Sequence, residues 1–315
     1  MKDLFNREID YLRISLTDLC NLRCTYCMPK DGVRKLSHEN ILSFERIKDI
    51  VEASVKLGIK KIRLTGGEPL VRKGISEICK IIAGIPGVEE LCLTTNGVLL
   101  KEYAKELKGA GVTRINISLD TLNKEKYKLI TRGGNLDDVL EGIKAVKEAG
   151  FKNTKINCVL IGGFNDDEIE DFAKFANSNE LSFRFIELMP IGEGEKLESK
   201  AFISNDEILK RLPDLVKVED DGVSSLYKFK CGGGSIGLIS PLSHSFCEKC
   251  SRIRLTSDGK LRPCLHSNLE VDLKDLSGDE LIEVIKKAIL LKPKEHHLIK
   301  DKKSSSERGM SEIGG

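Results

Sequence analysis

The sequence predicts an α/β protein, a partial (β/α)6 TIM-like barrel followed by a smaller C-terminal domain. Short β-branched runs alternate with amphipathic stretches from residue 10 to about residue 190, which is typical of successive βαβ units and a parallel sheet. Six such units fit a partial barrel better than a full eight-fold one. The strand-like runs are Tyr11–Leu16, Lys61–Leu64, Leu91–Thr95, Arg114–Leu119, Lys155–Ile161 and Ser182–Glu187.

Helical periodicity occupies the segments between these runs. In Phe44–Leu57 the residues Ile47, Ile50 and Val51 belong to a largely one-sided apolar set, and Leu136–Ala149 has a helical pattern too. We therefore expect helices that cover one face of the sheet. A doubly wound open sheet stays an alternative, because the same βαβ alternation also builds that fold.

Chemically distinctive residues follow four of the predicted strands. Cys20 comes after the first, Gly66 after the second, Asn96 after the third and Asp120 after the fourth. In barrels of this type the functional residues lie at the C-terminal ends of the strands. The sequence thus predicts a site at that rim.

Composition and charge limit the class of protein. With 315 residues, 40% of them hydrophobic, and no apolar run of 18 or more, we expect a soluble protein without a membrane partner. Lys plus Arg number 51 against 49 Asp plus Glu, so the global charge bias of non-specific nucleic-acid binders is lacking. Met1–Asp10 does not have the pattern of a signal peptide. We expect a cytoplasmic location and no disulfide framework.

Three cysteines near the N-terminus are the most informative feature of the chain. Cys20, Cys24 and Cys27 follow the pattern Cys-x3-Cys-x2-Cys. Thiolates this close together can bind three irons of a 4Fe–4S cluster and leave the fourth iron open to a substrate or cofactor. A zinc site, or a redox dithiol at Cys24 and Cys27, is the alternative, although a structural zinc site needs a fourth ligand.

A glycine-rich element follows the second strand. The chain continues from Lys61–Leu64 into Thr65-Gly66-Gly67-Glu68-Pro69. Alone, such an element would be a turn after a strand. Combined with the cysteine motif it indicates a binding site, because a backbone without side chains can approach a bound amino acid closely.

The pattern changes after about residue 215. Short strands and many Gly and Ser residues surround a second cysteine group, Cys247, Cys250 and Cys264. On spacing alone this group predicts a zinc site completed by His244 or His266. We expect a barrel at residues 5–215, a second domain at 216–300 and a flexible tail at 301–315 with the composition of a disordered segment.

The N-terminal motifs resemble those of the radical S-adenosylmethionine superfamily. The cysteine pattern with Tyr26 before its last cysteine is the superfamily's signature, and Gly66–Pro69 looks like its Gly-Gly-Glu-Pro element. Within the superfamily, the chain is similar over essentially its whole length to the GTP 3′,8-cyclase family of molybdenum cofactor biosynthesis. That similarity rests on the C-terminal Cys-x2-Cys-x13-Cys, the Arg-x-Arg of Arg252 and Arg254, and the terminal Gly-Gly.

The resemblance implies two 4Fe–4S clusters and S-adenosylmethionine as cofactors. Cys20, Cys24 and Cys27 would hold the first cluster. The second would be held by Cys247, Cys250 and Cys264, with its open iron on the guanine of GTP. The implied S-adenosylmethionine contacts are Tyr26, Gly67, Ser118 and Met189.

The implied substrate, GTP, carries several negative charges, so its pocket needs several converging cations. Arg252 and Arg254 alternate along one predicted strand and should point the same way. Gly232–Gly234 lacks the Lys-Ser or Lys-Thr of a P-loop, so side chains must bind the phosphates. The contacts implied by the resemblance are Arg13, Arg63, Thr94, Lys155, Arg252 and Arg254. Arg13 and Arg63 are embedded in apolar runs, which fits a solvated surface position poorly.

The resemblance also implies a reaction and partners. The 5′-deoxyadenosyl radical takes the ribose 3′ hydrogen, and the carbon radical attacks carbon 8. Reduction and protonation then give (8S)-3′,8-cyclo-7,8-dihydro-GTP. Gly314 and Gly315 would insert into the active site as a catalytic tail, since only glycine could approach bound ligands closely. The implied partners are an electron donor and the cyclic pyranopterin monophosphate synthase that receives the product. A homodimer stays open.

A radical S-adenosylmethionine enzyme acting on RNA or on a peptide, with a C-terminal auxiliary cluster or zinc site, is the alternative. An RNA modifier should show a basic patch with stacking aromatics, yet aromatics make up 5% of the chain and tryptophan is absent. The peptide-maturing class usually carries more than three C-terminal cysteines.

Overall fold

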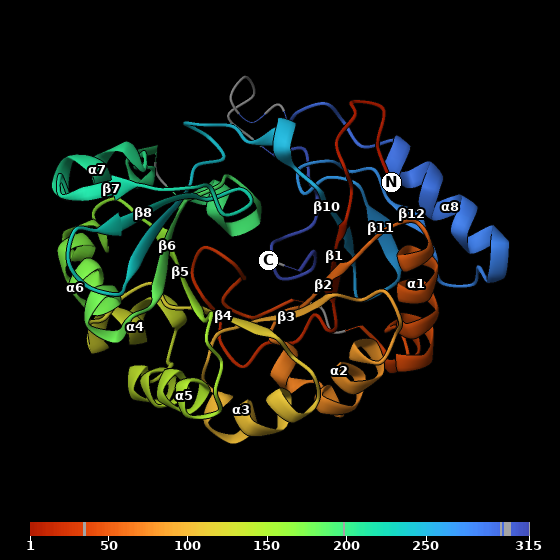
Figure 1. Ribbon diagram of the computed structural model, residues 1–315, viewed down its shortest axis with the longest axis horizontal. Helices are drawn as coiled ribbons and strands as arrows, with labels where there is room; N and C mark the ends of the chain where they lie inside the picture. Colours follow the sequence, from red (N-terminus) through yellow and green to blue (C-terminus); the bar gives the residue numbers. More distant parts are fainter. Residues whose placement is uncertain (34–35, 198, 297, 299–303, 315) are drawn as a thin grey trace.

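The computed structural model describes residues 1–33, 36–197, 199–296, 298 and 304–314. Its core is a ring of six parallel strands that are neighbours in chain order, surrounded by helices (Figure 1). The strands are β1 Tyr11–Ser15, β2 Lys61–Thr65, β3 Glu90–Thr95, β4 Arg114–Ser118, β5 Lys155–Leu160 and β6 Ser182–Glu187. The α-helices are α1 Phe44–Lys56, α2 Ile75–Ala83, α3 Leu100–Gly109, α4 Lys124–Thr131, α5 Leu136–Glu148, α6 Ile169–Asn179, α7 Asp206–Arg211 and α8 Gly278–Leu290.

The predicted partial (β/α)6 barrel is confirmed, and all six predicted strands end within a residue or so of the observed ones. The doubly wound alternative is wrong, because the strand order does not reverse between β1 and β6. Short 3-10 turns complete the chain: η1 His38–Asn40, η2 Pro69–Val71, η3 Asp166–Glu168, η4 Gly192–Lys196, η5 Ser199–Ala201 and η6 Cys247–Lys249.

Alternation along the strands explains the ring. On β4, Ile115 and Ile117 are fully buried in the main hydrophobic core, which contains apolar residues of the surrounding helices. Arg114, Asn116 and Ser118 lie on the other face of the same strand. Other strands alternate in a similar way, so the apolar face packs on the helices and polar side chains line the ring interior.

The C-terminal part of the chain extends both edges of this sheet. On one side β9 Ser235–Ile239 runs parallel to β6 and continues into β8 Ser225–Phe229 and β7 Leu215–Lys217. On the other side β10 Arg252–Leu255 runs parallel to β1 and continues into β11 Lys260–Arg262 and β12 Val271–Asp272. The sheet is continuous, and the predicted boundary near residue 215 falls at the start of β7.

The described part of the C-terminal tail lies against the sheet. The end of the chain reaches the middle of the ring (Figure 1), and Ser304, Ser311 and Ile313 are buried. Composition predicted a disordered tail, whereas residues 304–314 are packed and hydrogen-bonded. Residues 299–303 and Gly315 lie outside the described residues. Among the helices in the described ranges, none combines the length and the apolar character needed to cross a membrane.

Candidate active site

The first cysteine group lies on the loop that follows β1. Cys20, Cys24 and Cys27 are half-buried free thiols. The loop is tied to α4 by backbone hydrogen bonds: Arg23 N donates to Thr131 O (3.1 Å) and Thr25 N to Ile130 O (2.9 Å). The thiols are therefore held on an ordered loop at the C-terminal rim of the ring.

The surroundings of these thiols disfavour the thiolate form. Burial, with Cys20 and Asp120 nearby, raises the pKa of Cys27 to about 12. Burial and Asp120 also raise the pKa of Cys24 well above its usual value. Only a bound metal group would hold such thiols as thiolates at neutral pH, because metal ligation displaces the thiol protons. Three free thiols on one rigid loop fit a cluster ligand set.

The Gly-Gly-Glu-Pro element packs directly against the segment that leads to Cys20. A Cβ at Gly66 would lie 2.6 Å from Thr17 O, and one at Gly67 would lie 2.3 Å from Leu19 O. Glycine is thus required at both positions, because backbone atoms of the chain itself leave no room for a side chain. Ligand approach to Gly67 stays a prediction.

Glu68 connects this element to the end of β3. Its buried carboxylate accepts hydrogen bonds from Leu70 N (3.0 Å), Thr95 Oγ1 (2.7 Å) and Asn96 N (2.7 Å). Burial nevertheless raises its pKa to about 7. Asn96 in turn donates to Cys20 Sγ (3.8 Å), so Glu68 positions the rim beside the first thiol.

The predicted S-adenosylmethionine contacts lie around the same rim. Tyr26 donates its hydroxyl proton to Asp120 Oδ2 (2.7 Å), and Val159 N donates to the other oxygen (2.8 Å). Burial raises the pKa of Asp120 to about 6. Ser118 ends β4, and Met189 follows β6.

A row of arginines crosses three neighbouring strands. Arg13 on β1 is the register partner of Arg254 on β10 and of Arg63 on β2. Register partners place their side chains on the same face of a sheet. Burial, with Arg63 and Arg252 nearby, lowers the pKa of Arg13 to about 10, and burial with Arg13 nearby lowers the pKa of Arg254 further. We call Arg254, Arg13 and Arg63 the arginine row; Arg63 Nη1 also donates to Thr94 Oγ1 (3.1 Å).

A second basic pair lies on β5 and β6. Buried Lys155 and buried Arg184 both donate to Oδ2 of Asp221, which lies between β7 and β8. Burial and the Arg184 charge lower the pKa of Lys155 to about 8. Burial alone would raise the pKa of Asp221, but the charges of Arg184 and Lys155 lower it to about 2. Sequence reasoning missed Arg184, although it too stands in an apolar run, Phe183-Arg184-Phe185.

Two asparagines, buried Asn116 and partly buried Asn157, complete the polar face of the ring. Asn116 is the register partner of Thr94 and Lys155, and Asn157 pairs with Ser118 and Arg184. Within the described chain, the side-chain oxygens of both asparagines are buried without a hydrogen-bond partner. Such orphaned acceptors suit a site that receives donors from a ligand. The sequence signal for both is the polar residue within each alternating strand.

The second cysteine group lies beside β10 and β11. Cys247 begins the η6 turn, Cys250 directly follows it, and Cys264 follows β11. Burial would raise the pKa of Cys250, but Arg252 and Lys292 lower it to about 6. Arg7 Nη1 donates to Cys247 O (2.9 Å), which fixes this turn to the N-terminal segment. The charges here favour the thiolate form of Cys250, the form that binds a metal.

The histidines expected to complete a zinc site contact other groups. His244 Nε2 lies 2.8 Å from Asp206 Oδ1, and His266 Nδ1 lies 3.3 Å from Ser304 Oγ. Among the described residues, no three His, Cys, Asp or Glu side chains are grouped around one metal-ion position.

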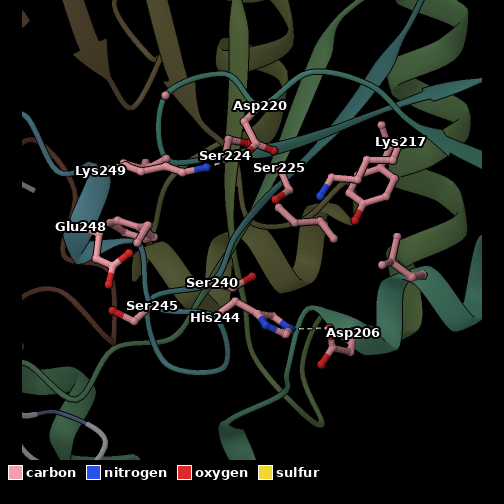
Figure 2. A pocket seen from close by; sticks show the side chains of 16 residues that line it. Asp206, Lys217, Asp220, Ser224, Ser225, Ser240, His244, Ser245, Glu248 and Lys249 are labelled. Atoms are coloured by element: carbon pink, nitrogen blue, oxygen red, sulfur yellow. Dashed lines mark hydrogen bonds and ion pairs between the residues drawn. The ribbon is translucent and has the colours of Figure 1, made fainter.

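A separate cavity of about 470 Å³ lies outside the ring, between α7, the β7–β8 hairpin and residues 244–249 (Figure 2). The charged side chains at its wall include Asp206, Lys217, Asp220, Glu248 and Lys249. None of the predicted nucleotide or S-adenosylmethionine contacts lines it.

The tail places Gly314 in contact with the arginine row. Gly314 O accepts from Arg254 Nη1 (2.8 Å) and from Arg13 Nη2 (3.3 Å). Its φ of 71° is in the left-handed region, and a Cβ there would lie 2.4 Å from Thr65 Oγ1. Position 314 therefore requires glycine in this arrangement. The prediction for Gly315 falls outside the described residues.

Comparison with known proteins matches this architecture. Residues 14–176 match the Radical SAM superfamily, and residues 181–298 match the family Molybdenum Cofactor Synthesis C. Two solved structures share the fold at low identity. The Streptococcus suis protein SuiB bound to precursor peptide SuiA has a TM-score of 0.67 at 15% identity, covering 91% of this chain and 67% of that one. Native anSMEcpe with bound AdoMet has a TM-score of 0.58 at 17% identity, covering 87% of this chain and 80% of that one. The fold and the cysteine loop thus define the radical S-adenosylmethionine class.

Curated relatives narrow this class. The GTP 3′,8-cyclase of Alkaliphilus oremlandii (strain OhILAs) is 52% identical, and that of Alkaliphilus metalliredigens (strain QYMF) is 50% identical, each over 100% of both chains. The GTP 3′,8-cyclase of Clostridium botulinum (strain Langeland / NCTC 10281 / Type F) is 48% identical over the same coverage. This chain belongs to the GTP 3′,8-cyclase family.

Proposed function

We infer that this protein is a radical S-adenosylmethionine GTP 3′,8-cyclase, a lyase that converts GTP to (8S)-3′,8-cyclo-7,8-dihydro-GTP in the first step of molybdenum cofactor biosynthesis. The inference rests on the side chains that line the interior of the ring and on the cysteine groups beside it. There, the arginine row, Lys155 and Arg184 lie on the polar face of the sheet, with a cysteine group at the end of β1 and another beside β10.

The basic side chains suit a triphosphate better than any neutral ligand. Burial and neighbouring arginine charges lower the pKa values of Arg13 and Arg254, and an anion that enters would form charge-assisted hydrogen bonds with them. We assign Arg13, Arg63, Arg252 and Arg254, with Lys155 and Arg184 on the facing strands, to GTP. Thr94, which Arg63 already contacts, would orient the nucleotide.

The cofactors fit the thiols that are present. Cys20, Cys24 and Cys27 would hold one 4Fe–4S cluster, and Cys247, Cys250 and Cys264 the other. When bound, the first cluster supplies the electron that splits S-adenosylmethionine to methionine and a 5′-deoxyadenosyl radical. Tyr26, Gly67, Ser118 and Met189, spread around the rim, would bind and orient S-adenosylmethionine.

The chain itself contributes positioning and exclusion of water. A carbon-bound hydrogen reacts with a radical only when the two are held close, so small misplacements are costly. Gly314 packed against Thr65 and the arginine row would close the ring over its ligands. The orphaned amide oxygens of Asn116 and Asn157 are acceptors for ribose hydroxyls or for the guanine N–H groups.

Finer features of the function follow from the same proposal. A one-electron cleavage requires an electron donor, and the cyclic product requires transfer to a downstream enzyme, which we assign to cyclic pyranopterin monophosphate synthase. We place the protein in the cytoplasm, where its thiols stay reduced. A homodimer is compatible with the exposed apolar side chains Leu4, Phe5 and Leu291.

The test uses anaerobically reconstituted full-length protein with S-adenosylmethionine, a reductant and GTP deuterated at the ribose 3′ position. Deuterium should appear in 5′-deoxyadenosine. The cyclised product should have the mass of unlabelled GTP, because a proton replaces the deuterium that was lost. GTP deuterated at the 2′ position is the control and should transfer no label. Label transfer from 2′, or 5′-deoxyadenosine without cyclised nucleotide, would contradict the proposal.

A further inference from the structure

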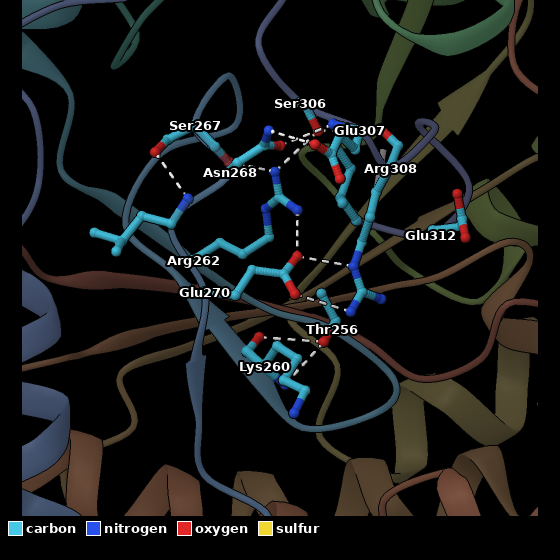
Figure 3. Close-up of polar contacts among 12 residues, drawn as sticks. Thr256, Lys260, Arg262, Ser267, Asn268, Glu270, Ser306, Glu307, Arg308 and Glu312 are labelled. Carbon is cyan, nitrogen blue, oxygen red and sulfur yellow. Dashed lines mark hydrogen bonds and ion pairs between the residues drawn. The ribbon is translucent and has the colours of Figure 1, made fainter.

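The tail is attached to the β10–β11 hairpin by a cluster of ion pairs (Figure 3). Arg308 donates to both carboxylate oxygens of Asp258, from Nη1 (3.1 Å) and from Nη2 (2.9 Å). Its Nε and Nη2 also contact Glu270, at 2.8 Å and 2.9 Å. Each of these contacts is charge-assisted and is therefore stronger than a hydrogen bond between neutral groups.

Glu270 is itself held in place by a second arginine. Arg262, which is 1% exposed, donates to Glu270 Oε1, so the carboxylate lies between two guanidinium groups (Figure 3). Arg262 also donates to Ser306 Oγ (2.9 Å). Because the partners come from a turn and from residues beside β11, the attachment is rigid on the sheet side. We call Arg308, Asp258, Glu270 and Arg262 the tail latch.

The hairpin that carries the latch also carries the arginine row. Arg254 is on β10, four positions before Asp258, and its Nη1 donates to the tail carbonyls of Ile313 (3.3 Å) and Gly314 (2.8 Å). From Arg308 to Gly314 the chain has six steps, roughly 20 Å when fully extended. The turn in which Gly309 N donates to Glu312 Oε2 (2.8 Å) shortens that reach. Both ends of the segment 308–314 are thus fixed to one hairpin.

We propose that Arg308 is a positioning residue for the cyclisation. Its pairing with Asp258 and Glu270 fixes the starting point of the last residues and so keeps Gly314 at the arginine row while the nucleotide reacts. A tail that is already ordered meets the site at a high effective concentration, whereas a released tail loses conformational entropy at each insertion. This inference rests on the proposed function, because it concerns the same reaction.

The first arm measures the tail without measuring activity. Hydrogen exchange of the peptide 304–314 is compared among the parent, Arg308→Ala and Arg308→Lys in the full-length reconstituted protein. We expect exchange of the Gly309 and Glu312 amides to be about tenfold faster in Arg308→Ala, and intermediate in Arg308→Lys, which keeps one charge but not the fork. Asp258→Asn should act like Arg308→Lys, since it keeps an acceptor.

The second arm measures coupling, as cyclised nucleotide formed per 5′-deoxyadenosine. We expect this ratio to fall about tenfold in Arg308→Ala while the KM for S-adenosylmethionine stays at the parent value. Arg211→Ala is the matched control: Arg211 has a similar exposure, 31% against 24%, and pairs with Glu207 on α7. It should leave both measurements unchanged.

The outcomes are distinct. Unchanged exchange in Arg308→Ala would show that the latch does not hold the tail. Faster exchange with unchanged coupling would show that tail position does not serve the reaction, and either result overturns the proposal. A parent protein that makes no cyclised nucleotide would overturn the proposed function instead, while the exchange arm would still decide whether Arg308 anchors the tail.

Discussion

The two cysteine groups lie in opposite electrostatic surroundings. Asp120 is close to Cys24 and Cys27, and together with burial it raises their thiol pKa values. Arg252 and Lys292 are close to Cys250 and lower its pKa to about 6 in spite of burial. One cysteine group has therefore been placed in an acidic environment and the other in a basic one.

This difference separates two tasks. The first group lies on a loop of its own, with the carboxylate of Asp120 beside Cys24 and Cys27. The second group adjoins the arginine row and so shares its positive surroundings with the site for a polyanion. The cations of the proposed substrate side thus come from barrel strands as well as from the C-terminal strand β10.

The largest effect is expected for Cys24→Ala. Two thiols cannot replace three ligands, so 5′-deoxyadenosine formation should fall roughly a thousandfold or more, as for other essential groups. The second cluster should persist, with about four irons per chain. Cys231→Ala, which removes an exposed free thiol, is the control and should behave as the parent. Retained cleavage of S-adenosylmethionine in Cys24→Ala would remove the first group from that task.

The triple replacement of Cys247, Cys250 and Cys264 by Ala tests the other side. Iron content should fall from about eight to about four per chain, with cleavage of S-adenosylmethionine retained and cyclisation lost. Metal analysis and product assays on the same anaerobic sample give the answer. Stoichiometric zinc with only about four irons in the parent would show that the second group binds zinc.

Arg254→Ala tests the arginine row as the substrate clamp. Loss of a buried guanidinium that contacts the tail and adjoins Arg13 should misplace the ribose and lower the yield of cyclised nucleotide about a hundredfold. Slow formation of 5′-deoxyadenosine should continue. Lys230→Ala, which only breaks a surface pair with Asp214, should match the parent. Equal yields of both products from Arg254→Ala and the parent would exclude this residue from the site.

Asp221→Asn should improve GTP binding. Lys155 and Arg184 now share one oxygen of this half-exposed carboxylate, which must be displaced if phosphates are to use the same cations. Removal of a partly solvated ion pair should tighten GTP binding about threefold to fivefold, as equilibrium binding would show. Asp220→Asn, next to it but paired with Lys249, is the matched control. Weaker binding in Asp221→Asn would mean that the carboxylate supports the cations.

The smallest effect concerns pH. Lys155 has a pKa of about 8, below its ordinary value of 10.5, so it is charged below pH 8 and neutral above it. A bound phosphate favours the charged form, so GTP affinity should fall as pH rises above 8, by at most about tenfold per pH unit. Arg at this position stays charged, so Lys155→Arg should lack this component although it shares the titration of GTP. Parallel pH profiles for the two proteins would contradict the assignment of Lys155.

Features set by local spacing could be predicted from the sequence. The six strands, the order of motifs at their ends and the two cysteine groups all follow from periodicity and from residues close together in the chain. The glycines at positions 66 and 67 were predicted from the approach of a ligand, and the structure gives an additional reason, the close contact with the chain's own Thr17 and Leu19. A local pattern of glycines shows that other atoms come close to the backbone there. It does not show whether those atoms belong to a ligand or to the chain itself.

Only the tertiary structure decided which distant residues meet. The arginine row depends on the register of β10 against β1, two strands more than 200 residues apart, and no local pattern encodes that register. The same holds for Asp221 between Lys155 and Arg184, and for Arg308 on Asp258 and Glu270. Short-range periodicity and spacing encode the fold class and the two cysteine groups, because these features depend on residues close together in the chain. The meeting of the arginines and the attachment of the tail depend on the register of the sheet. That register is set by contacts between strands that become neighbours only when the chain folds.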